Sequence, residues 1–71
     1  MSKTEIAQFV EALNKLCGEA NEAARLSSEI FEGDELKQVR RNLARCMEIV
    51  DGDVIPVLKK HHPNIKGLPY E

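Results

Sequence analysis

The sequence feature with the clearest chemical potential is a set of four basic residues, Lys37, Arg40, Arg41 and Arg45. On a helix, these spacings place the four side chains along one basic stripe. Such a stripe can lie along the phosphates of an RNA backbone. No aromatic residue is interleaved for base stacking, and the formal net charge of the chain is −2. A protein-binding patch is therefore a second interpretation of the same residues.

A third interpretation of this stripe is a solvated face that pairs with acids of the same chain. Residues 1–35 carry eight acidic and three basic side chains, whereas residues 36–71 carry four acidic and seven basic ones. Because the two halves attract one another, the pattern predicts two elements that lie side by side. Glu22, Glu29 and Glu32 are the acids expected to pair with the stripe, each exposed pair contributing about 0–1 kcal/mol.

Residue types that bind metals are present, but their spacing does not predict a metal site. His61 and His62 are adjacent, so on a helix their rings point about 100° apart. The stretch 51–53, Asp-Gly-Asp, lacks the remaining ligands and the terminal Glu of a calcium loop. Cys17 and Cys46 both fall on apolar helical faces, which favours reduced thiols packed in a core. We expect no metal and no cofactor.

Motifs of catalysis and of membrane insertion are not found in the sequence. There is no glycine-rich phosphate loop or nucleophile elbow, and two helices do not readily enclose a substrate. Residues 1–15 are amphipathic and acidic, unlike a secretory signal or a transit peptide, and no apolar run reaches membrane-spanning length. We therefore expect a cytoplasmic protein that is not an enzyme and does not bind membranes.

The first predicted element is a helix over residues 3–32. Ser2 and Glu5 form a capping-box pattern at its start, and apolar residues then recur at alternating spacings of four and three. Gly33 is expected to end this helix in a left-handed conformation, with Asp34 as the N-cap of the next helix. The turn is therefore placed at residues 33–34.

The second predicted element is a helix over residues 35–60, which completes an all-α antiparallel hairpin. Its apolar spacing persists through Gly52 and Pro56, although Pro56 clashes with the carbonyl group four residues earlier. Either the helix is kinked and continuous, or it breaks at Asp51-Gly52 and Asp53 caps a short third helix. Residues 1–60 thus form the hairpin, and residues 61–71, with two prolines and a glycine, form an extended tail.

The middle of the first helix, residues 17–27, is unusually thin, because small side chains occupy most of its core positions. Small residues allow the two helices of a hairpin to approach closely. Each helix nevertheless carries more apolar columns than one neighbour covers. The extra column of the first helix comprises Phe9, Leu16, Ala23 and Ile30.

A symmetric dimer of hairpins, forming a four-helix bundle, is the arrangement that covers these surplus columns. We expect a homodimer, because a chain of this size builds only a marginal core alone. Small side chains on the first helix allow another helix to come close. The candidate interface residues are Ala7, Asn14, Cys17, Ala20, Asn21, Ala24 and Ser28.

Ile55 lies on the opposite side of the second helix from its main apolar stripe. In one interpretation, Ile65, Leu68 or Tyr70 of the tail folds back over it. In the other, Ile55 forms an exposed apolar patch with Leu68 and Tyr70 that docks a partner.

The composition and these patterns predict a small regulatory or adaptor protein that binds another protein through its helix faces. Antitoxins, immunity proteins, phage inhibitors and secretion chaperones are proteins of this kind. Two alternatives stay open: a dimeric hairpin that binds RNA through the basic stripe, and a structural subunit that self-assembles.

Overall fold

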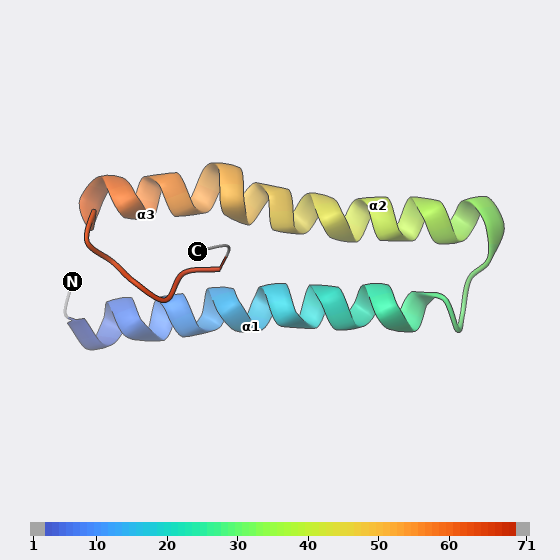
Figure 1. The fold of residues 1–71 in the computed structure, drawn as a ribbon, viewed down its shortest axis with the longest axis horizontal. Coiled ribbons are helices and arrows are strands. Elements are labelled where there is room, and N and C mark those ends of the chain that lie inside the picture. Colours follow the sequence, from blue (N-terminus) through green and yellow to red (C-terminus); the bar gives the residue numbers. More distant parts are fainter. Residues whose placement is uncertain (1–2, 70–71) are drawn as a thin grey trace.

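The computed structural model describes residues 3–69 and shows an antiparallel helical hairpin, 45 × 19 × 17 Å in extent. Two helical arms lie side by side, and the tail turns back along them from the end of α3 (Figure 1). This confirms the predicted hairpin with a kinked second arm. The elements in chain order are α1 (Lys3–Ser27), α2 (Gly33–Ile49), the π-helical segment η1 (Val50–Val54) and α3 (Ile55–His61).

Helix α1 ends at Ser27, five residues before the predicted end. The Ser27 hydroxyl donates to the Ala24 carbonyl at 2.6 Å, and the Ser28 hydroxyl donates to the Arg25 carbonyl at 2.9 Å. Serine side chains that bond to the backbone of the preceding turn compete with continued helix formation. The apolar spacing that continues to Phe31 therefore does not correspond to helix.

Helix α2 begins at Gly33, so the prediction of Asp34 as its N-cap was wrong. Glu32 occupies the cap position with extended backbone, and its side chain makes no capping hydrogen bond. Gly33 does adopt the predicted left-handed conformation, with φ of 61°. It acts at the start of α2 rather than at the end of α1, and residues 28–32 form the connection.

The kink in the second arm is a π-helical segment. The Ile55 amide donates to the Val50 carbonyl, five residues back, so the helix widens by one residue per turn here. Pro56 follows in the first turn of α3, where its missing amide hydrogen matters least. The arm is thus continuous and locally widened, and it does not break at Asp51-Gly52.

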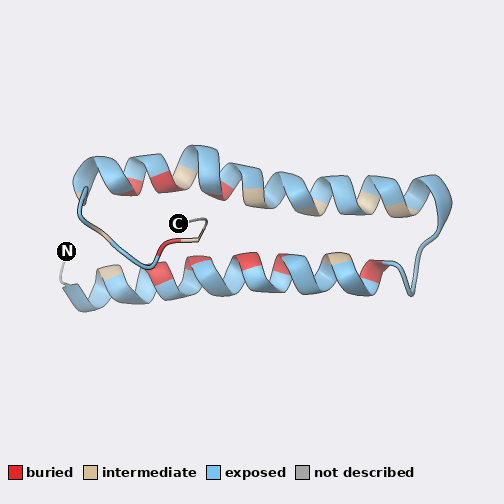
Figure 2. Ribbon diagram, in the orientation of Figure 1, coloured by how far each residue is buried: buried red, intermediate tan, exposed pale blue. Residues whose placement is uncertain are grey.

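The hydrophobic core lies at the end of the hairpin where α1 meets α3 and the tail (Figure 2). No large side chain among residues 3–69 is completely buried, and α2 contributes no buried residue. In the turn-proximal half of the hairpin, Ala20 and Ser27 of α1 are buried, whereas the most enclosed side chains of α2 are only half-buried. The buried apolar residues that form one cluster are Val10, Leu13, Cys17, Val50, Ile55, Leu58 and Leu68.

Alanine substitutions at two glycines are expected to change the stability of the fold in opposite directions. Gly18 lies inside α1 with open space where a Cβ atom would be, so Gly18→Ala is expected to stabilise the fold by about 0.5–1 kcal/mol. Gly33 also has open space, but its φ of 61° is strained for any residue with a Cβ atom. We expect Gly33→Ala to destabilise by about 1 kcal/mol. Urea denaturation of both variants at one protein concentration tests this, and stabilisation by both would contradict the left-handed conformation at residue 33.

Candidate interaction surface

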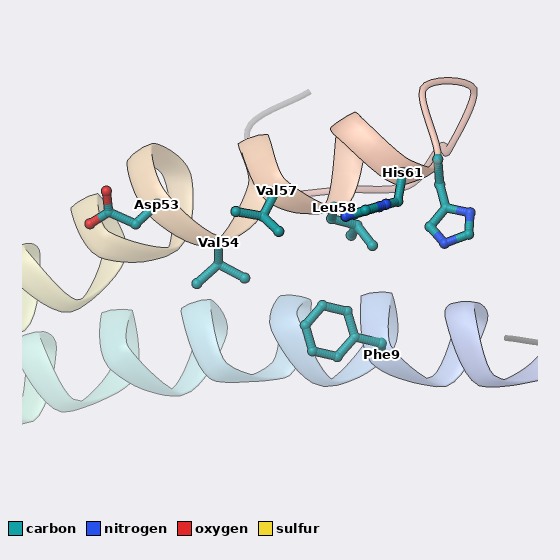
Figure 3. Close-up of a pocket in the computed structure, with 7 residues that line it drawn as sticks. Phe9, Asp53, Val54, Val57, Leu58 and His61 are labelled. Atoms are coloured by element: carbon teal, nitrogen blue, oxygen red, sulfur yellow. The ribbon is translucent and has the colours of Figure 1, made fainter.

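An open apolar groove of about 740 Å³ lies between α1 and the α3 end of the second arm. Phe9 of α1 faces Val54, Val57 and Leu58, and Asp53 lies at the edge (Figure 3). His61 and His62 complete the lining. The walls are mostly apolar, so the groove favours an apolar side chain from outside over a polar ligand.

The groove continues into a longer exposed surface, which we call the apolar flank and define by Phe9, Leu16, Ile49 and Val57. These side chains are between 43% and 58% exposed. Leu16 follows Phe9 by two helical turns, and Ile49 precedes the groove residue Asp53 by about one of the wider turns of η1. The four side chains therefore share one side of the hairpin, two from each arm.

The sequence contained part of the signal for this surface. Phe9 and Leu16 belong to the surplus column of the first helix, and their exposure is what that surplus predicts. Ile49 and Val57 lie in the helix predicted over residues 35–60, and the structure leaves them 53% and 58% exposed. The π-helical segment changes the register between Ile49 and Val57, and a regular helical period does not anticipate that change.

The tail covers part of the opposite flank of the hairpin. The Asn14 side-chain amide donates to the Gly67 carbonyl at 2.7 Å and to the Val10 carbonyl at 3.1 Å. Leu68 is buried in the core, and Ile65 packs against it. Asn14 thus binds the tail of its own chain in the structure.

The small residues chosen as dimer-interface candidates divide into two groups. Cys17 and Ala20 are buried, and Ala24 is half-buried. Cys17 belongs to the core of the single hairpin, and Ala20 is equally inaccessible, so neither is available to a second copy. The others, Ala7, Asn14, Asn21 and Ser28, are exposed on α1 and in the turn after it.

The exposed patch predicted around Ile55 is not present. Ile55 and Leu68 are each only 5% exposed, and both belong to the core cluster. The alternative in which the tail folds back is therefore the one that the structure has. Tyr70, the third residue of that prediction, lies outside the described residues.

The basic stripe is divided by the structure. Lys37, Arg41 and Arg45 line one shallow outer surface of α2 together with Asp34, Gln38 and Asn42. Arg40 instead reaches across the hairpin, where its Nε donates to the Ala24 carbonyl at 3.4 Å.

The acids that were expected to neutralise the stripe do not pair with it among residues 3–69. Glu22 forms a two-point ion pair with Arg25 on its own helix, with Arg25 Nε and Glu22 Oε2 3.1 Å apart. The prediction that Glu22 pairs across the hairpin was therefore wrong. A partner three residues away on the same helix is reached with less loss of side-chain freedom.

The Glu22–Arg25 pair predicts a small pH effect. The hydrogen bonds from Arg25 hold the pKa of Glu22 below its ordinary value of 4.5, with desolvation opposing them weakly. Because the pKa is lowered in the folded state, the pair stabilises the fold above the ordinary pKa, and this contribution is lost as pH falls through the lowered one. We expect carboxyl NMR titration of Glu22 to give a midpoint below 4.5, which Arg25→Gln returns towards 4.5. An unchanged midpoint in that variant would contradict the pairing.

No group of three or more His, Cys, Asp or Glu side chains is placed to hold a metal ion within residues 3–69. None of the helices in that range is long and apolar enough to cross a membrane. No protein-family model, curated protein or solved structure matches the chain. The functional argument therefore depends on the surfaces described above.

Proposed function

We propose that this chain is a small, non-enzymatic protein-binding module that acts as a regulator or adaptor through its apolar flank. The observation that carries the proposal is the alignment of Phe9, Leu16, Ile49 and Val57, each about half exposed, along one side of both arms. Isolated exposed apolar residues are common on protein surfaces, but an aligned set next to a groove is typical of an interaction site. Steric blocking of a target protein is the simplest consequence of docking there.

The groove beside Phe9 supports the same proposal, because it offers a socket for an apolar anchor. Its wall residues come from the two arms of the hairpin, which the core holds together, since Leu58 is buried and Val54 packs against the core. A socket built on packed helices is already formed before a partner arrives, which reduces the ordering cost of binding.

The test is affinity purification of the tagged protein from its own cells, as wild type and as two variants. Leu16→Glu places a charge in the apolar flank at a half-exposed helical site, and Asn21→Glu places the same charge on the other side of α1. We expect a stoichiometric partner protein that is lost with Leu16→Glu and retained with Asn21→Glu. Retention with both variants would contradict docking at the apolar flank. Circular dichroism checks that both variants keep their helices.

A second candidate, RNA binding, is favoured by one observation: Lys37, Arg41 and Arg45 have no acidic partner within residues 3–69. Three neighbouring cations on an outer helical surface suit a phosphate backbone. The same purification tests it through the ratio of absorbance at 260 and 280 nm, because the chain has no Trp and one Tyr. A high ratio that falls after RNase treatment and in an Arg41→Gln/Arg45→Gln variant would support this candidate, whereas a low ratio for the wild type would exclude it.

A further inference from the structure

The single hairpin exposes far more surface than a compact chain of its size. Its accessible surface is 5521 Å². A compact monomer of 8.0 kDa is expected to expose about 4450 Å². The difference of about 1000 Å² resembles the roughly 800 Å² that each partner buries in a stable interface of standard size. The excess accessible surface of the hairpin is therefore large enough to form one interface with a second protein chain of similar size.

The charged residues next to the apolar flank indicate which protein chain covers this surface. One helical turn from Phe9 and Leu16, α1 carries Glu5 and Glu19. On the second arm, the residues one turn from Ile49 and from Val57 at the outer edge carry positive charge. Arg45 lies one turn before Ile49, and Lys60 lies one turn after Val57.

One edge of the flank is thus acidic along α1, and the other is basic along α2 and α3, with Asp53 as the one acidic residue of the groove on that arm. A surface with one acidic and one basic edge is complementary to itself after a two-fold rotation.

We propose that the apolar flank joins two copies of this chain into a four-helix bundle, with α1 of each copy lying on α2 and α3 of the other. The inference rests on the proposed function, in that it takes the apolar flank to be a protein-docking surface, and a second copy and a target protein therefore compete for that surface. The two-fold axis runs parallel to the helices, so that the acidic edge of each copy meets the basic edge of the other. A two-fold axis across the helices would instead place acidic α1 on acidic α1.

This symmetry also sets which residues meet. Phe9 and Val57 lie level because they share the groove. Leu16 lies seven residues beyond Phe9 on α1, about 10 Å along the helix axis. Ile49 lies eight residues before Val57 on the antiparallel arm, about 12 Å in the same direction. Rotation about an axis parallel to the helices preserves these levels. Leu16 of one copy therefore packs beside Ile49 of the second copy, and Glu19 approaches its Arg45.

The tail explains why this flank is the interface rather than the opposite one. On the opposite side of α1, Asn14 already binds the Gly67 carbonyl. Ile65 and Leu68 pack onto the core from that side. A second copy arriving there would have to displace the tail, whereas the apolar flank is open along both arms. The bundle predicted from the sequence is thus retained as a proposal, but with a different face.

Sedimentation equilibrium across a wide concentration range gives the first test. We expect the wild type and Asn21→Glu to sediment at twice the 8.0 kDa chain mass. Leu16→Glu buries two unpaired charges in the proposed dimer, and the dissociation constant is expected to rise at least about 100-fold. A wild type that stays monomeric overturns the proposal. So does a dimer that Asn21→Glu weakens as much as Leu16→Glu does.

A charge exchange tests the arrangement itself. Glu19→Arg alone sets arginine against arginine across the dimer, and Arg45→Glu alone sets glutamate against glutamate, so each is expected to dimerise about tenfold more weakly. Mixing the two variants restores both opposite-charge contacts in a heterodimer, and we expect that heterodimer to form preferentially. Mixing without preference overturns the proposed axis, because an ion pair within one chain gains nothing from a second variant.

The outcomes distinguish this inference from the proposed function. A monomeric wild type that still loses its co-purified partner through Leu16→Glu keeps the protein-binding function and removes the homodimer. A dimer that Leu16→Glu dissociates, with no other protein in the purification, keeps the homodimer and removes the adaptor function.

Discussion

Leu68→Ala is expected to lower the free energy of unfolding by about 2–4 kcal/mol, although the residue belongs to an irregular tail. Leu68 is only 5% exposed and belongs to the same core cluster as Ile55 and Leu58. Removing its side chain leaves a cavity where the tail closes the core. Urea denaturation at a fixed protein concentration measures the loss, because a self-associating chain has a concentration-dependent stability.

The matched control for this variant is Leu26→Ala. Leu26 is 38% exposed on α1, so the same truncation there is expected to cost less than about 1.5 kcal/mol. Equal losses for the two leucines would show that the tail does not pack on the core. A loss confined to Leu68 would show that the tail is part of the folded unit.

Ile55→Lys is expected to have the largest effect on stability, about 3–5 kcal/mol, because it places an unpaired charge in the core. Ile55 is 5% exposed, directly follows the π-helical segment and belongs to the same core cluster as Leu68 of the tail. The lysine must either displace Leu68 or lose its proton in an apolar site. Thermal unfolding monitored by circular dichroism is expected to show a large fall in Tm or no cooperative transition.

Ile30→Lys is the control for this substitution. Ile30 is 74% exposed in the connection after α1, so we expect a change within about 0.5 kcal/mol. A variant at Ile55 that unfolds like the one at Ile30 would contradict the burial of Ile55. It would also return Ile55 to the list of surface residues available to a partner.

The hairpin itself could be predicted from the sequence, because apolar spacing and the charge difference between the halves report directly on two packed helices. The end of α1 could not, since Ile30 and Phe31 continue the apolar spacing while Ser27 and Ser28 end the helix through local hydrogen bonds. Periodicity records which side chains are apolar. It does not record competition for backbone carbonyls.

The candidate surface was harder to predict than the fold. Whether Ile55 is exposed depends on where an eleven-residue tail without any periodic pattern packs, and that is decided by tertiary contacts such as Asn14 with Gly67. Likewise, the exposure of Ile49 and Val57 depends on the extra residue in the π-helical turn. Glu22 could pair either with Arg25 on its own helix or with the basic stripe on the second arm, and sequence spacing alone does not rank these two partners.

The position of the core near the two ends of the described chain has a consequence for the order of events during synthesis. Val10, Leu13 and Cys17 pack in one cluster with residues that follow them by more than thirty positions, and Leu68 is made after all the others of that cluster. Closing so long a loop is entropically unfavourable until those late contacts form. While the ribosome is still translating residues 60–68, the buried residues of α1 lack the Leu68 side chain that completes their core cluster. The chain is therefore expected to fold after its tail has left the ribosome, and until then its apolar side chains are open to chaperones.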